Sequence, residues 1–391
     1  MNKKTVSDLT SLRGRTAFVT CDFNISLKNG KAVNNTRIVK ALPTINYLLS
    51  RGCRVVLASH LGRPQGVDPQ YSLKPVAAAL TSLIKKPVRL INNFWDKSAL
   101  REIDENRSGI TLLENIRFFP GERENDQDFS RHLSQMADFF VNDAFGASHR
   151  VYASTVGITN YLPSVAGLLL DLEIRMLSKA LNNPEKPFVI FIGGAKTPEK
   201  ISVIEKLLDK ADTIALGGAI ANTFLAAWGF GLGQSMVDYE MVEMARVVFW
   251  KATRIHSALV LPVDVMIQAN GGKALPRVSD YDKVPNGSAI YDIGPATVNI
   301  YCKLLKGAGT VIWNGPMGFY ENKHYKKGTD SILKEITRAR AFSIVGGGDT
   351  LSCLDKKDYF DKISHVSTGG SAMLEFMKEG TLPGIEVLLD K

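Results

Sequence analysis

Short apolar runs alternate with amphipathic stretches along the whole chain. In the first half, four runs have the length and composition of buried strands: 16–21, 54–58, 111–113 and 139–141. Between them, stretches that end at Leu49 and at Lys85 place apolar residues three or four positions apart, which predicts helices. Strands that alternate with helices predict an α/β fold with a parallel, doubly wound sheet, whose ligands bind beyond the carboxyl ends of the strands.

The second half repeats this pattern and places glycines directly after its strands. Apolar runs lead into four glycine turns: Gly193-Gly194-Ala195-Lys196, Gly217-Gly218-Ala219, Gly346-Gly347-Gly348-Asp349-Thr350 and Gly369-Gly370-Ser371. Glycine lets backbone N–H groups approach a ligand closely, and a following helix N-terminus favours negative charge. We therefore expect a sheet edge with phosphate-sized backbone pockets. No GxxxxGK[ST] loop and no well-placed GxGxxG occurs. The run 259–265 is predicted as one further strand, with Asp264 in a structural role.

A longer periodic stretch joins the two halves. From Pro163 to Asn183 an apolar stripe recurs at helical spacing, and Asn182-Asn183-Pro184 ends it. Its place between two α/β halves makes this stretch a candidate interdomain helix. A surface helix of the first domain is the alternative that the pattern leaves open.

Four charged residues of the second half are candidates for ligand binding, and the two lysines among them suit a bound anion. Lys196 lies in a turn and Lys200 near the start of the next helix, where a cation opposes the helix dipole unless an anion is bound. Two solvated lysines are the alternative. Asp349 could cap a helix or hold a metal ion. Glu321 could bond ribose hydroxyls or face water.

Polar residues also follow the predicted strands of the first half, and five of them are cationic or can be: Arg37, His60, Arg63, Arg117 and Arg150. Forked guanidinium groups suit phosphate and carboxylate oxygens, and several are needed for a multiply charged small molecule. Each arginine alone could equally be a surface residue, and His60 could be neutral in a turn. Asp22 and Asn24 could bond substrate hydroxyls or orient the arginines.

Composition narrows the class of protein. At 391 residues the chain has room for two or three domains, and 45% hydrophobic with 22% charged residues is typical of a globular protein. Residues 1–170 carry 22 Lys and Arg against 14 Asp and Glu, which accounts for +8 of the net +9. The first half is therefore expected to handle something anionic. The chain contains no Lys/Arg-rich run of the kind that would indicate nucleic-acid binding. Apolar runs are too short for a signal peptide or a membrane span, and four scattered cysteines fit a reducing cytoplasm.

Taken together, the motifs resemble the phosphoglycerate kinase family from end to end. The matching stretches are Asp22-Phe23-Asn24, Ser59-His60-Leu61-Gly62-Arg63-Pro64, Leu113-Glu114-Asn115-Ile116-Arg117-Phe118, His149-Arg150, Gly193-Gly194-Ala195-Lys196, Trp313-Asn314-Gly315-Pro316-Met317-Gly318, Gly346-Gly347-Gly348-Asp349-Thr350, Ser367-Thr368-Gly369-Gly370 and Leu382-Pro383-Gly384-Ile385-Glu386. The resemblance implies a cytoplasmic, monomeric enzyme of glycolysis and gluconeogenesis. It implies two Rossmann-like domains joined by the long helix: residues 1–170, completed by the tail 380–391, and residues 171–379.

The resemblance also implies the reaction, which is Mg²⁺-dependent phosphoryl transfer between 1,3-bisphosphoglycerate and ADP, giving 3-phosphoglycerate and ATP, in line and after hinge closure. It assigns the acid substrate to Asp22, Asn24, Arg37, His60, Arg63, Arg117 and Arg150. It assigns the nucleotide to Gly194, Lys196, Lys200, Gly218, Asn314, Glu321, Gly346, Gly347, Gly348, Asp349 and Thr350, with Asp349 as metal ligand. The catalytic residues would be Arg37, Lys196, Gly347 and Gly370. A carboxylate nucleophile needs no general base, so catalysis rests on positioning and charge stabilisation.

Five residues at four places in the chain depart from the family pattern. The family carries arginine where this chain has Thr20, Asn-Val-Pro where it has Asn24-Ile25-Ser26, histidine where it has Tyr152, and glycine where it has Ser371. Losing a charged donor at position 20 could cost roughly 1.5–3 kcal/mol of substrate binding. Besides an active phosphoglycerate kinase, two hypotheses stay open. Thr20 suggests a related acyl-phosphate kinase with another substrate preference, and the basic charge suggests a non-catalytic binding protein.

Overall fold

The computed structural model describes residues 2–28, 31–96, 98–106, 109–195, 197–255, 257–269, 275–353 and 357–391. These residues form two compact units. The N-terminal unit contains Met1–Arg175 and Thr381–Lys391, and the C-terminal unit contains Met176–Gly380. The boundary lies inside one helix, five residues beyond the position 170 expected from the sequence.

A six-stranded parallel sheet forms the centre of the N-terminal unit, in the order β5-β6-β4-β1-β7-β8. Its strands are β1 (Thr16–Thr20), β4 (Arg54–Ala58), β5 (Arg89–Ile91), β6 (Ile110–Leu113), β7 (Phe139–Asn142) and β8 (Ser164–Ala166). β1 pairs with β4 on one side and β7 on the other, in the register Phe18↔Val56 and Phe18↔Phe140. Every residue of β1 is buried, and its three central residues, Ala17, Phe18 and Val19, are apolar rather than alternating with polar ones.

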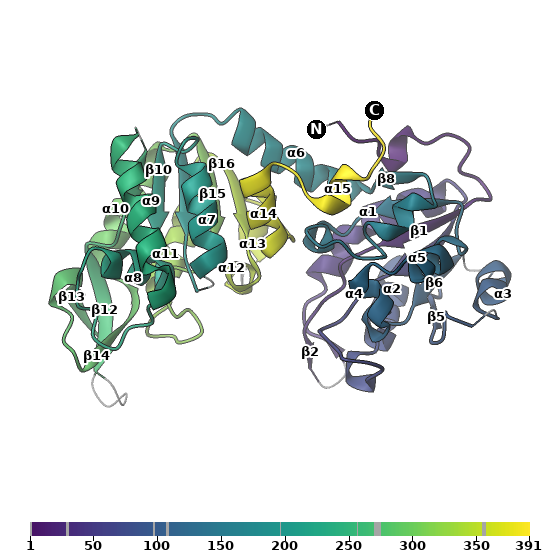
Figure 1. The fold of residues 1–391 in the computed structure, drawn as a ribbon, viewed down its shortest axis with the longest axis horizontal. Helices are drawn as coiled ribbons and strands as arrows, with labels where there is room; N and C mark the ends of the chain where they lie inside the picture. The colour runs from purple at the N-terminus through teal and green to yellow at the C-terminus, as the bar shows by residue number, and fades with distance from the viewer. Residues whose placement is uncertain are drawn as a thin grey trace. The chain divides into compact units, whose positions relative to one another are not determined.

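Helices cover both faces of this sheet (Figure 1). They are α1 (Thr36–Ser50), α2 (Lys74–Ile84), α3 (Ser98–Glu105), α4 (Pro120–Glu124) and α5 (Gln127–Ser134), with short 3₁₀ turns η3 (Ile116–Phe118), η4 (Phe145–Ala147) and η5 (Gly157–Asn160) between elements. The apolar stripe of α1, which includes Ile38, Ile45 and Leu48, packs on Val19 and Val55. A small two-stranded ribbon, β2 (Leu27–Lys28) with β3 (Lys31–Ala32), completes the unit.

The C-terminal unit is built around a second six-stranded parallel sheet, in the order β11-β10-β9-β15-β16-β17. Its strands are β9 (Phe188–Ile192), β10 (Thr213–Leu216), β11 (Ala258–Val260), β15 (Thr310–Asn314), β16 (Phe342–Gly346) and β17 (His365–Val366). Numbered within the unit, the order is 3-2-1-4-5-6, which is that of dinucleotide-binding sheets. The strand order reverses between β9 and β15, which are parallel neighbours, so ligands are expected where these two strands end.

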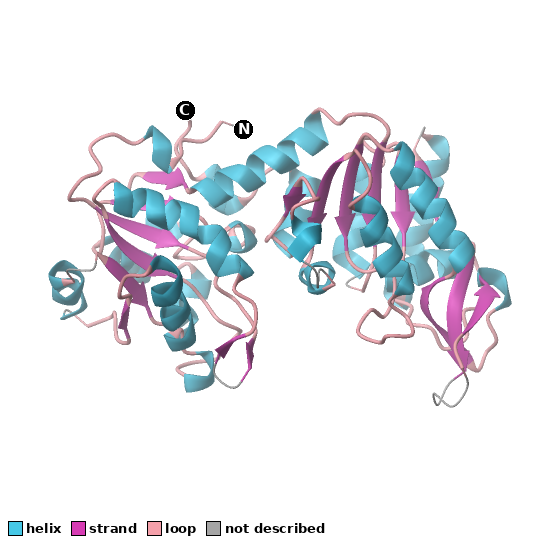
Figure 2. Ribbon diagram, turned by 180° about the vertical axis from the view of Figure 1, so that it is seen from behind, coloured by secondary structure: helices cyan, strands magenta, loops and turns pink. Residues whose placement is uncertain are grey.

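Helices flank this sheet as well (Figure 2). They are α7 (Thr197–Leu207), α8 (Gly218–Ala227), α9 (Val242–Arg254), α10 (Pro295–Gly307), α11 (Lys327–Ile336), α12 (Gly348–Ser352), α13 (Lys357–Phe360) and α14 (Ser371–Glu379). Tyr301 and Leu305 of α10 pack with Ile332 of α11 against Trp313 and Phe191 of the sheet. The predicted fold class, two Rossmann-like parallel-sheet domains, is confirmed.

One predicted strand proved wrong. The run 259–265 is not continuous, since β11 ends at Val260 and Asp264 begins β12 (Asp264–Ala269) in a different sheet. β12 pairs antiparallel with β13 (Arg277–Asp280) and β14 (Ser288–Ile293). Pro262, which lacks a backbone donor, lies in the connection. Asp264 does have the predicted structural role, because its carboxylate accepts the backbone N–H groups of Ala296 and Thr297 at the start of α10.

The predicted helix from Pro163 to Asn183 begins later than expected. Residues 164–166 pair with β7 as strand β8, and the helix α6 runs from Leu168 to Asn182. Asp143, at the end of β7, explains the start, because its Oδ1 accepts the N–H groups of Leu169 and Leu170 at 2.9 and 3.2 Å. α6 contributes residues to both units, as expected of the segment that joins them.

The two chain ends meet on the N-terminal unit (Figure 1). Lys4 donates its N–H to the carbonyl of Leu389, and Leu389 donates its N–H to the carbonyl of Ser164 in β8. The short helix α15 (Pro383–Glu386) is anchored by Asn142, whose Nδ2 donates to the carbonyl of Gly384 at 2.7 Å. The tail therefore completes the N-terminal unit.

Candidate active site

An ion pair between a carboxylate and a guanidinium lies at the end of β1. Asp22 follows this strand, and its carboxylate forms an ion pair with Arg37 in the first turn of α1. Asn24 donates its N–H to the other carboxylate oxygen at 3.1 Å. Burial raises the pKa of Asp22, but the charge of Arg37, together with the hydrogen bonds from Arg37 and the Asn24 N–H, outweighs it and holds the pKa below its usual value. Asp22 is therefore an anion that fixes the Arg37 guanidinium.

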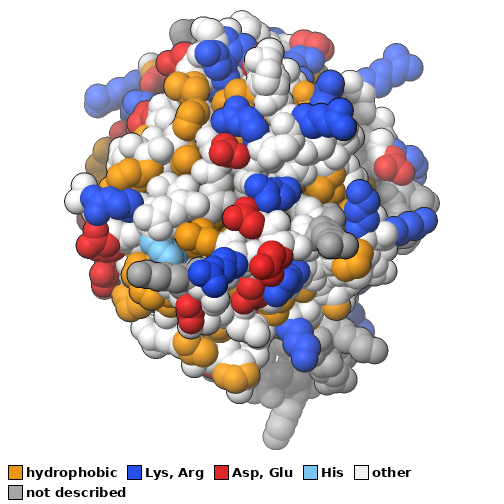
Figure 3. Space-filling view, turned by 90° about the vertical axis from the view of Figure 1, so that its right-hand side faces the viewer, with side chains coloured by type: hydrophobic (Ala, Val, Ile, Leu, Met, Phe, Trp, Pro, Cys, Tyr) orange, Lys and Arg blue, Asp and Glu red, His pale blue; other side chains and the backbone are white. Residues whose placement is uncertain are grey.

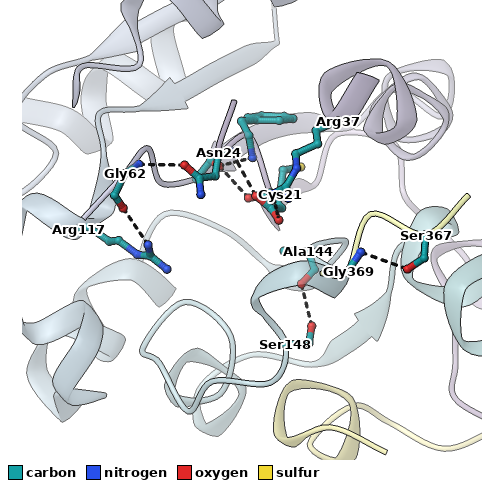
Figure 4. A network of polar contacts seen from close by, with 12 residues as sticks. Cys21, Asn24, Arg37, Gly62, Arg117, Ala144, Ser148, Ser367 and Gly369 are labelled. Atoms are coloured by element: carbon teal, nitrogen blue, oxygen red, sulfur yellow. Dashed lines mark hydrogen bonds and ion pairs between the residues drawn. The ribbon is translucent and has the colours of Figure 1, made fainter. Parts of the chain in front are cut away.

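Residues after β4 and β6 are connected to this pair through backbone groups. Gly62 donates its N–H to Asn24 Oδ1 at 2.9 Å, and its carbonyl accepts from Arg117 Nη1 at 2.9 Å (Figure 4). A Cβ at position 62 would lie 2.3 Å from the ring of Tyr71, so only glycine fits this connection. Asn24, Gly62 and Arg117 are thereby brought together from three strand ends.

His60 is buried beside this cluster and is neutral. Burial lowers its pKa to about 3, and Arg117, Arg37 and Arg123 act in the same direction, while Asp22 opposes them. A neutral imidazole can donate or accept a hydrogen bond but adds no positive charge. The cationic character of this site therefore comes from its arginines.

Arg63 and Arg150, the remaining two predicted acid ligands, are exposed. Arg150 follows η4, and its Nε donates to His149 Nε2 at 3.0 Å. Their guanidinium groups are accessible to a ligand from solvent. The structure thus closely connects Asp22, Asn24, Arg37, His60 and Arg117, and leaves Arg63 and Arg150 at the surface.

Two supporting residues had no assigned role in the sequence prediction. Asn115 Nδ2 donates to the carbonyls of Leu61 and Tyr71, and Glu114 accepts from Ser72 Oγ and the Leu73 N–H. These bonds tie the segment after β6 to the segment after β4. Both residues belong to a stretch that matched the family motif, so the motif was the available signal.

Thr20 does not face the acid ligands. Its side chain is 2% exposed, and its hydroxyl donates to the backbone carbonyl of Ser154 at 2.7 Å. The departure from the family pattern at this position therefore changes a buried hydrogen-bond network rather than the exposed arginines.

In the C-terminal unit, the strand ends surround a cavity of about 670 Å³. Four residues predicted to bind nucleotide line it: Gly194, Gly218, Glu321 and Asp349. The cavity lies where β9 and β10 end and where β15 leads into the Pro316–Gly318 turn, at the reversal of the strand order. Its size suits a nucleotide-sized ligand.

The glycine turns behind this cavity pack backbone against backbone. A Cβ on Gly218, which has φ +61°, would lie 2.5 Å from the N of Gly194, and one on Gly193 would lie 2.1 Å from the carbonyl oxygen of Pro316. Gly218 donates its N–H to Met317 and opens α8 with its N-terminus towards the cavity side. Such a helix end favours an anionic ligand.

Other predicted nucleotide residues lie beneath the turns. Lys200 is 5% exposed, and its Nζ donates to the carbonyl of Gly193. Thr350 is fully buried and accepts the Gly315 N–H at 2.7 Å, and Asn314 is 4% exposed at the end of β15. Lys196 lies outside the described residues. Lys200 thus supports the glycine turn from below.

Three predicted glycines lie at the C-terminal end of β16, and a fourth precedes α14. Gly346 is buried at the end of β16, Gly347 caps α12 with φ +100°, and Gly348 begins that helix at the surface. Gly370 caps α14 with φ +54°. The positive φ values at both cap positions require glycine for an unstrained turn.

Sequence reasoning missed an aromatic and acidic wall of the cavity. Tyr291 and Phe319 line it, and Tyr291 stacks on Tyr325 with ring centroids 4.7 Å apart. Asp292 also lines it and accepts the N–H groups of Ile293 and Gly328. Burial raises the pKa of Asp292 to about 7. Tyr291 and Asp292 belong to β14, and their contribution to a cavity depends on tertiary packing.

The donor set of the cavity suits Mg²⁺ brought by a nucleotide. Across the described residues, no group of three or more His, Cys, Asp or Glu could hold a metal by itself. Mg²⁺ is commonly held by one or two carboxylates together with substrate phosphates. Asp349 is exposed on the cavity wall, and Glu321 lines the same cavity. The residues present therefore fit a metal that arrives with its phosphates.

Comparison with known proteins decides the family. The model of the family described as "Phosphoglycerate kinase" matches residues 6–380. The chain belongs to the phosphoglycerate kinase family. It is similar to the phosphoglycerate kinases of Pelotomaculum thermopropionicum, 41% identical over the full length of both chains, and Moorella thermoacetica, 44% identical with the same coverage.

Solved phosphoglycerate kinases have the same fold. The structure from Coxiella burnetii is 40% identical, with a TM-score of 0.85, and that from Pyrococcus horikoshii is 30% identical, with a TM-score of 0.87. Each comparison covers 98% of both chains. The predicted resemblance is confirmed.

Family membership establishes the activity of the chain. It is a phosphotransferase with a carboxyl group as acceptor, which transfers a phosphoryl group reversibly between 1,3-bisphosphoglycerate and ADP to give 3-phosphoglycerate and ATP. The predicted function and enzyme class are confirmed. None of the helices in the described part of the chain is long and apolar enough to cross a membrane.

Proposed function

We propose that the N-terminal unit binds the phosphoglycerate and that the C-terminal unit binds the nucleotide. The observation that carries this assignment is the contrast between the two sets of strand ends. Arginines, a neutral histidine and Asn24 gather after β1, β4 and β6, whereas glycine turns and a cavity of about 670 Å³ follow β9, β10 and β15. Guanidinium groups suit a small, multiply charged acid, and backbone N–H groups suit the phosphates of a larger ligand.

In the N-terminal unit, each acid ligand has a role suited to its setting. Arg37 and Arg117 are held by Asp22 and by the carbonyl of Gly62, so their direction is fixed before a substrate arrives. Arg63 and Arg150 are exposed and complete the charge around the phosphate and carboxylate. His60 and Asn24 supply neutral hydrogen bonds to the substrate hydroxyl and carboxylate.

In the C-terminal unit, Gly194 and Gly218 contribute backbone groups and Glu321 bonds the ribose. Asp349 holds Mg²⁺, which when bound neutralises phosphate charge on the nucleotide. Lys196 and Arg37 stabilise the charge of the transferring phosphoryl group, and Gly347 and Gly370 present backbone N–H groups to it. α6, which belongs to both units, is the hinge for the closure that in-line transfer requires. We assign the enzyme to the cytoplasm as a monomer.

The charge distribution of the surface bears on the alternative of a non-catalytic binding protein. On the face shown in Figure 3, Lys and Arg side chains are interspersed with acidic and apolar ones rather than gathered into one basic band. A protein that binds an anionic macromolecule typically has such a band of basic residues on its surface. The arginines of the strand ends are instead held in a defined cluster, which favours a small substrate.

The assay that tests this function is ATP-dependent phosphorylation of 3-phosphoglycerate, coupled to a dehydrogenase that consumes the product, with wild type and Thr20→Arg side by side. We expect robust activity in the wild type, because the acid-site arginines are in place without an arginine at position 20. A related kinase with another acid substrate would instead show no wild-type activity with 3-phosphoglycerate. Absence of activity with this acid in both proteins would overturn the proposal.

Replacing Asp349 with asparagine should raise the Mg²⁺ concentration needed for half-maximal activity about 10-fold or more, because a neutral amide holds the ion far less well than a carboxylate. The measurement is a magnesium titration of kcat at saturating ATP and acid. Asp330→Asn, an exposed carboxylate on α11 that pairs with Lys326, is the matched control and should leave the titration unchanged. Superimposable titrations of Asp349→Asn and wild type would remove Asp349 from the metal site.

A further inference from the structure

A buried carboxylate lies beside the acid-substrate residues without being one of them. Glu122, on α4, is 2% exposed. Its Oε1 accepts the hydroxyl of Ser154 at 2.7 Å, and its Oε2 accepts the N–H of Ser154 at 3.0 Å. The carbonyl of Ser154 in turn accepts the Thr20 hydroxyl at 2.7 Å. Ser154 is thus fastened on two sides, by α4 and by β1.

The segment that Glu122 fastens contains Arg150, a predicted acid ligand, and Tyr152, whose ring contacts Arg117. Thr155 Oγ1 donates to the carbonyl of Arg150 at 2.9 Å and accepts the N–H of Tyr152 at 3.2 Å. The ring of Tyr152 lies under the guanidinium of Arg117, with the centroid 5.7 Å away. Anchoring Ser154 therefore holds Arg150 and Tyr152 in the turn that follows β7.

One of the two cations that act on Glu122 belongs to the acid-substrate site. The cations that act on it are Arg117 on η3 and Arg123 on its own helix. The charged side chains of the neighbouring α5 are engaged elsewhere, since Arg131 pairs with Asp128 and His132 bonds the carbonyl of Phe94. β1 contributes only the neutral Thr20, and the 150–155 segment contributes Ser154 and Tyr152. Within the described residues, no ion pair reaches the Glu122 carboxylate.

We propose that Glu122 is a positioning residue of the acid-substrate site, which anchors the Arg150–Thr155 segment and whose ionisation sets how strongly Arg117 attracts the substrate. This inference rests on the proposed function, in which the N-terminal unit binds the phosphoglycerate. Glu122 acts through Ser154 and Arg117 and does not touch the substrate.

The direction of the effect follows from the charge of the carboxyl. Burial raises the pKa of Glu122 to about 7, although both Ser154 hydrogen bonds, Arg117 and Arg123 lower it. Below that pH the group is mainly neutral, and the positive field of Arg117 acts fully on the anionic substrate. Above it the carboxylate offsets part of that field, so substrate affinity falls as the pH rises.

Glu122→Gln tests the charge while keeping the anchor, because a glutamine amide has nearly the same shape and the Ser154 hydroxyl can turn to accept from it. The measurement is the KM for 3-phosphoglycerate at pH 6 and pH 8, expressed as the ratio of wild type to variant. Taking the ratio cancels the titration of the substrate phosphate itself. We expect a ratio near 1 at pH 6 and about 3 at pH 8, the size expected for one partly screened charge.

Three controls separate positioning from a general structural role. Glu124→Gln, an exposed carboxylate on the same helix, should leave the ratio near 1 at both pH values. The KM for ATP should not change in Glu122→Gln. Glu122→Ala, which removes the anchor, should raise the acid KM about 10-fold at both pH values, and glutamine should prevent that rise.

Each outcome decides the inference. A wild-type to Glu122→Gln ratio that is the same at both pH values, or an equal effect of Glu124→Gln, would overturn it. If both proteins bind ATP but neither phosphorylates 3-phosphoglycerate, the proposed function fails, and this inference fails with it. If the enzyme phosphorylates 3-phosphoglycerate but the KM ratio is the same at both pH values, only this inference is rejected and the proposed function stands.

Discussion

Replacing Arg37 with alanine should lower kcat for 3-phosphoglycerate phosphorylation about 10²–10³-fold, the usual cost of removing one charge-stabilising donor from an active site. Arg37 is the guanidinium fixed by the Asp22 carboxylate, so its direction is set before substrate binds. Removing it leaves that carboxylate, which is mostly buried, without its ion-pair partner, and the pKa of Asp22 should rise. The measurement is kcat and KM for both substrates in the coupled assay.

Two variants make this test specific. Arg51→Ala removes the guanidinium that stacks on Tyr47 at the other end of the same helix and should leave kcat unchanged. Arg37→Lys keeps the charge but loses the forked donors and should recover only part of the activity. If Arg37→Ala kept kcat within threefold of wild type, Arg37 would have no catalytic role.

Gly218→Ala should weaken nucleotide binding about 10-fold or more and lower the thermal midpoint of unfolding. The added Cβ would clash with backbone atoms, which cannot move aside as a flexible side chain could. The Cβ would lie 2.5 Å from the N and 2.9 Å from the Cα of Gly194, which lines the cavity. Positive φ at position 218 adds strain for alanine. Calorimetric titration with MgADP and a thermal melt measure the two effects.

Gly229→Ala is the matched control for this variant. Gly229 also has a positive φ, of +89°, and follows the end of the same helix α8, but a Cβ there meets nothing within 4 Å. It should therefore show the cost of backbone strain alone, about 1 kcal/mol, with MgADP affinity unchanged. Equal effects of the two substitutions on MgADP affinity would mean that the close approach of the glycine turns is not what shapes the nucleotide site.

Most of the central strands of the two parallel sheets, and the polar or glycine residues directly after them, could be predicted from the sequence. Strands of a parallel sheet are buried on both faces and are mostly apolar, so a run such as 139–141 can be recognised as a strand from the sequence. Polar residues directly after them, such as Asp22 and His60, must lie at one sheet edge because the strands are parallel. That is why the proximity of Asp22, Asn24, His60 and Arg117 could be predicted before any contact was known.

Other features depend on tertiary packing and could not be predicted locally. Residues 164–166 continue a helical stripe, yet they pair with β7 because Asp143 caps the helix only from Leu169 onward. The run 259–265 has a strand composition throughout, but its two parts enter different sheets. Glu122 has an ordinary sequence context, and only the packing of the 150–155 segment buries it.

The most direct test of the two-site assignment is amide hydrogen exchange of the whole enzyme with one ligand at a time. With 3-phosphoglycerate alone, we expect added protection in the segments after β1 and β4, including Asn24 and Gly62. With MgADP alone, we expect it at the glycine turns after β9 and β10, including Gly194 and Gly218. Protection of the glycine turns by the acid, or of the arginine cluster by the nucleotide, would contradict the assignment of the two substrates to the two units.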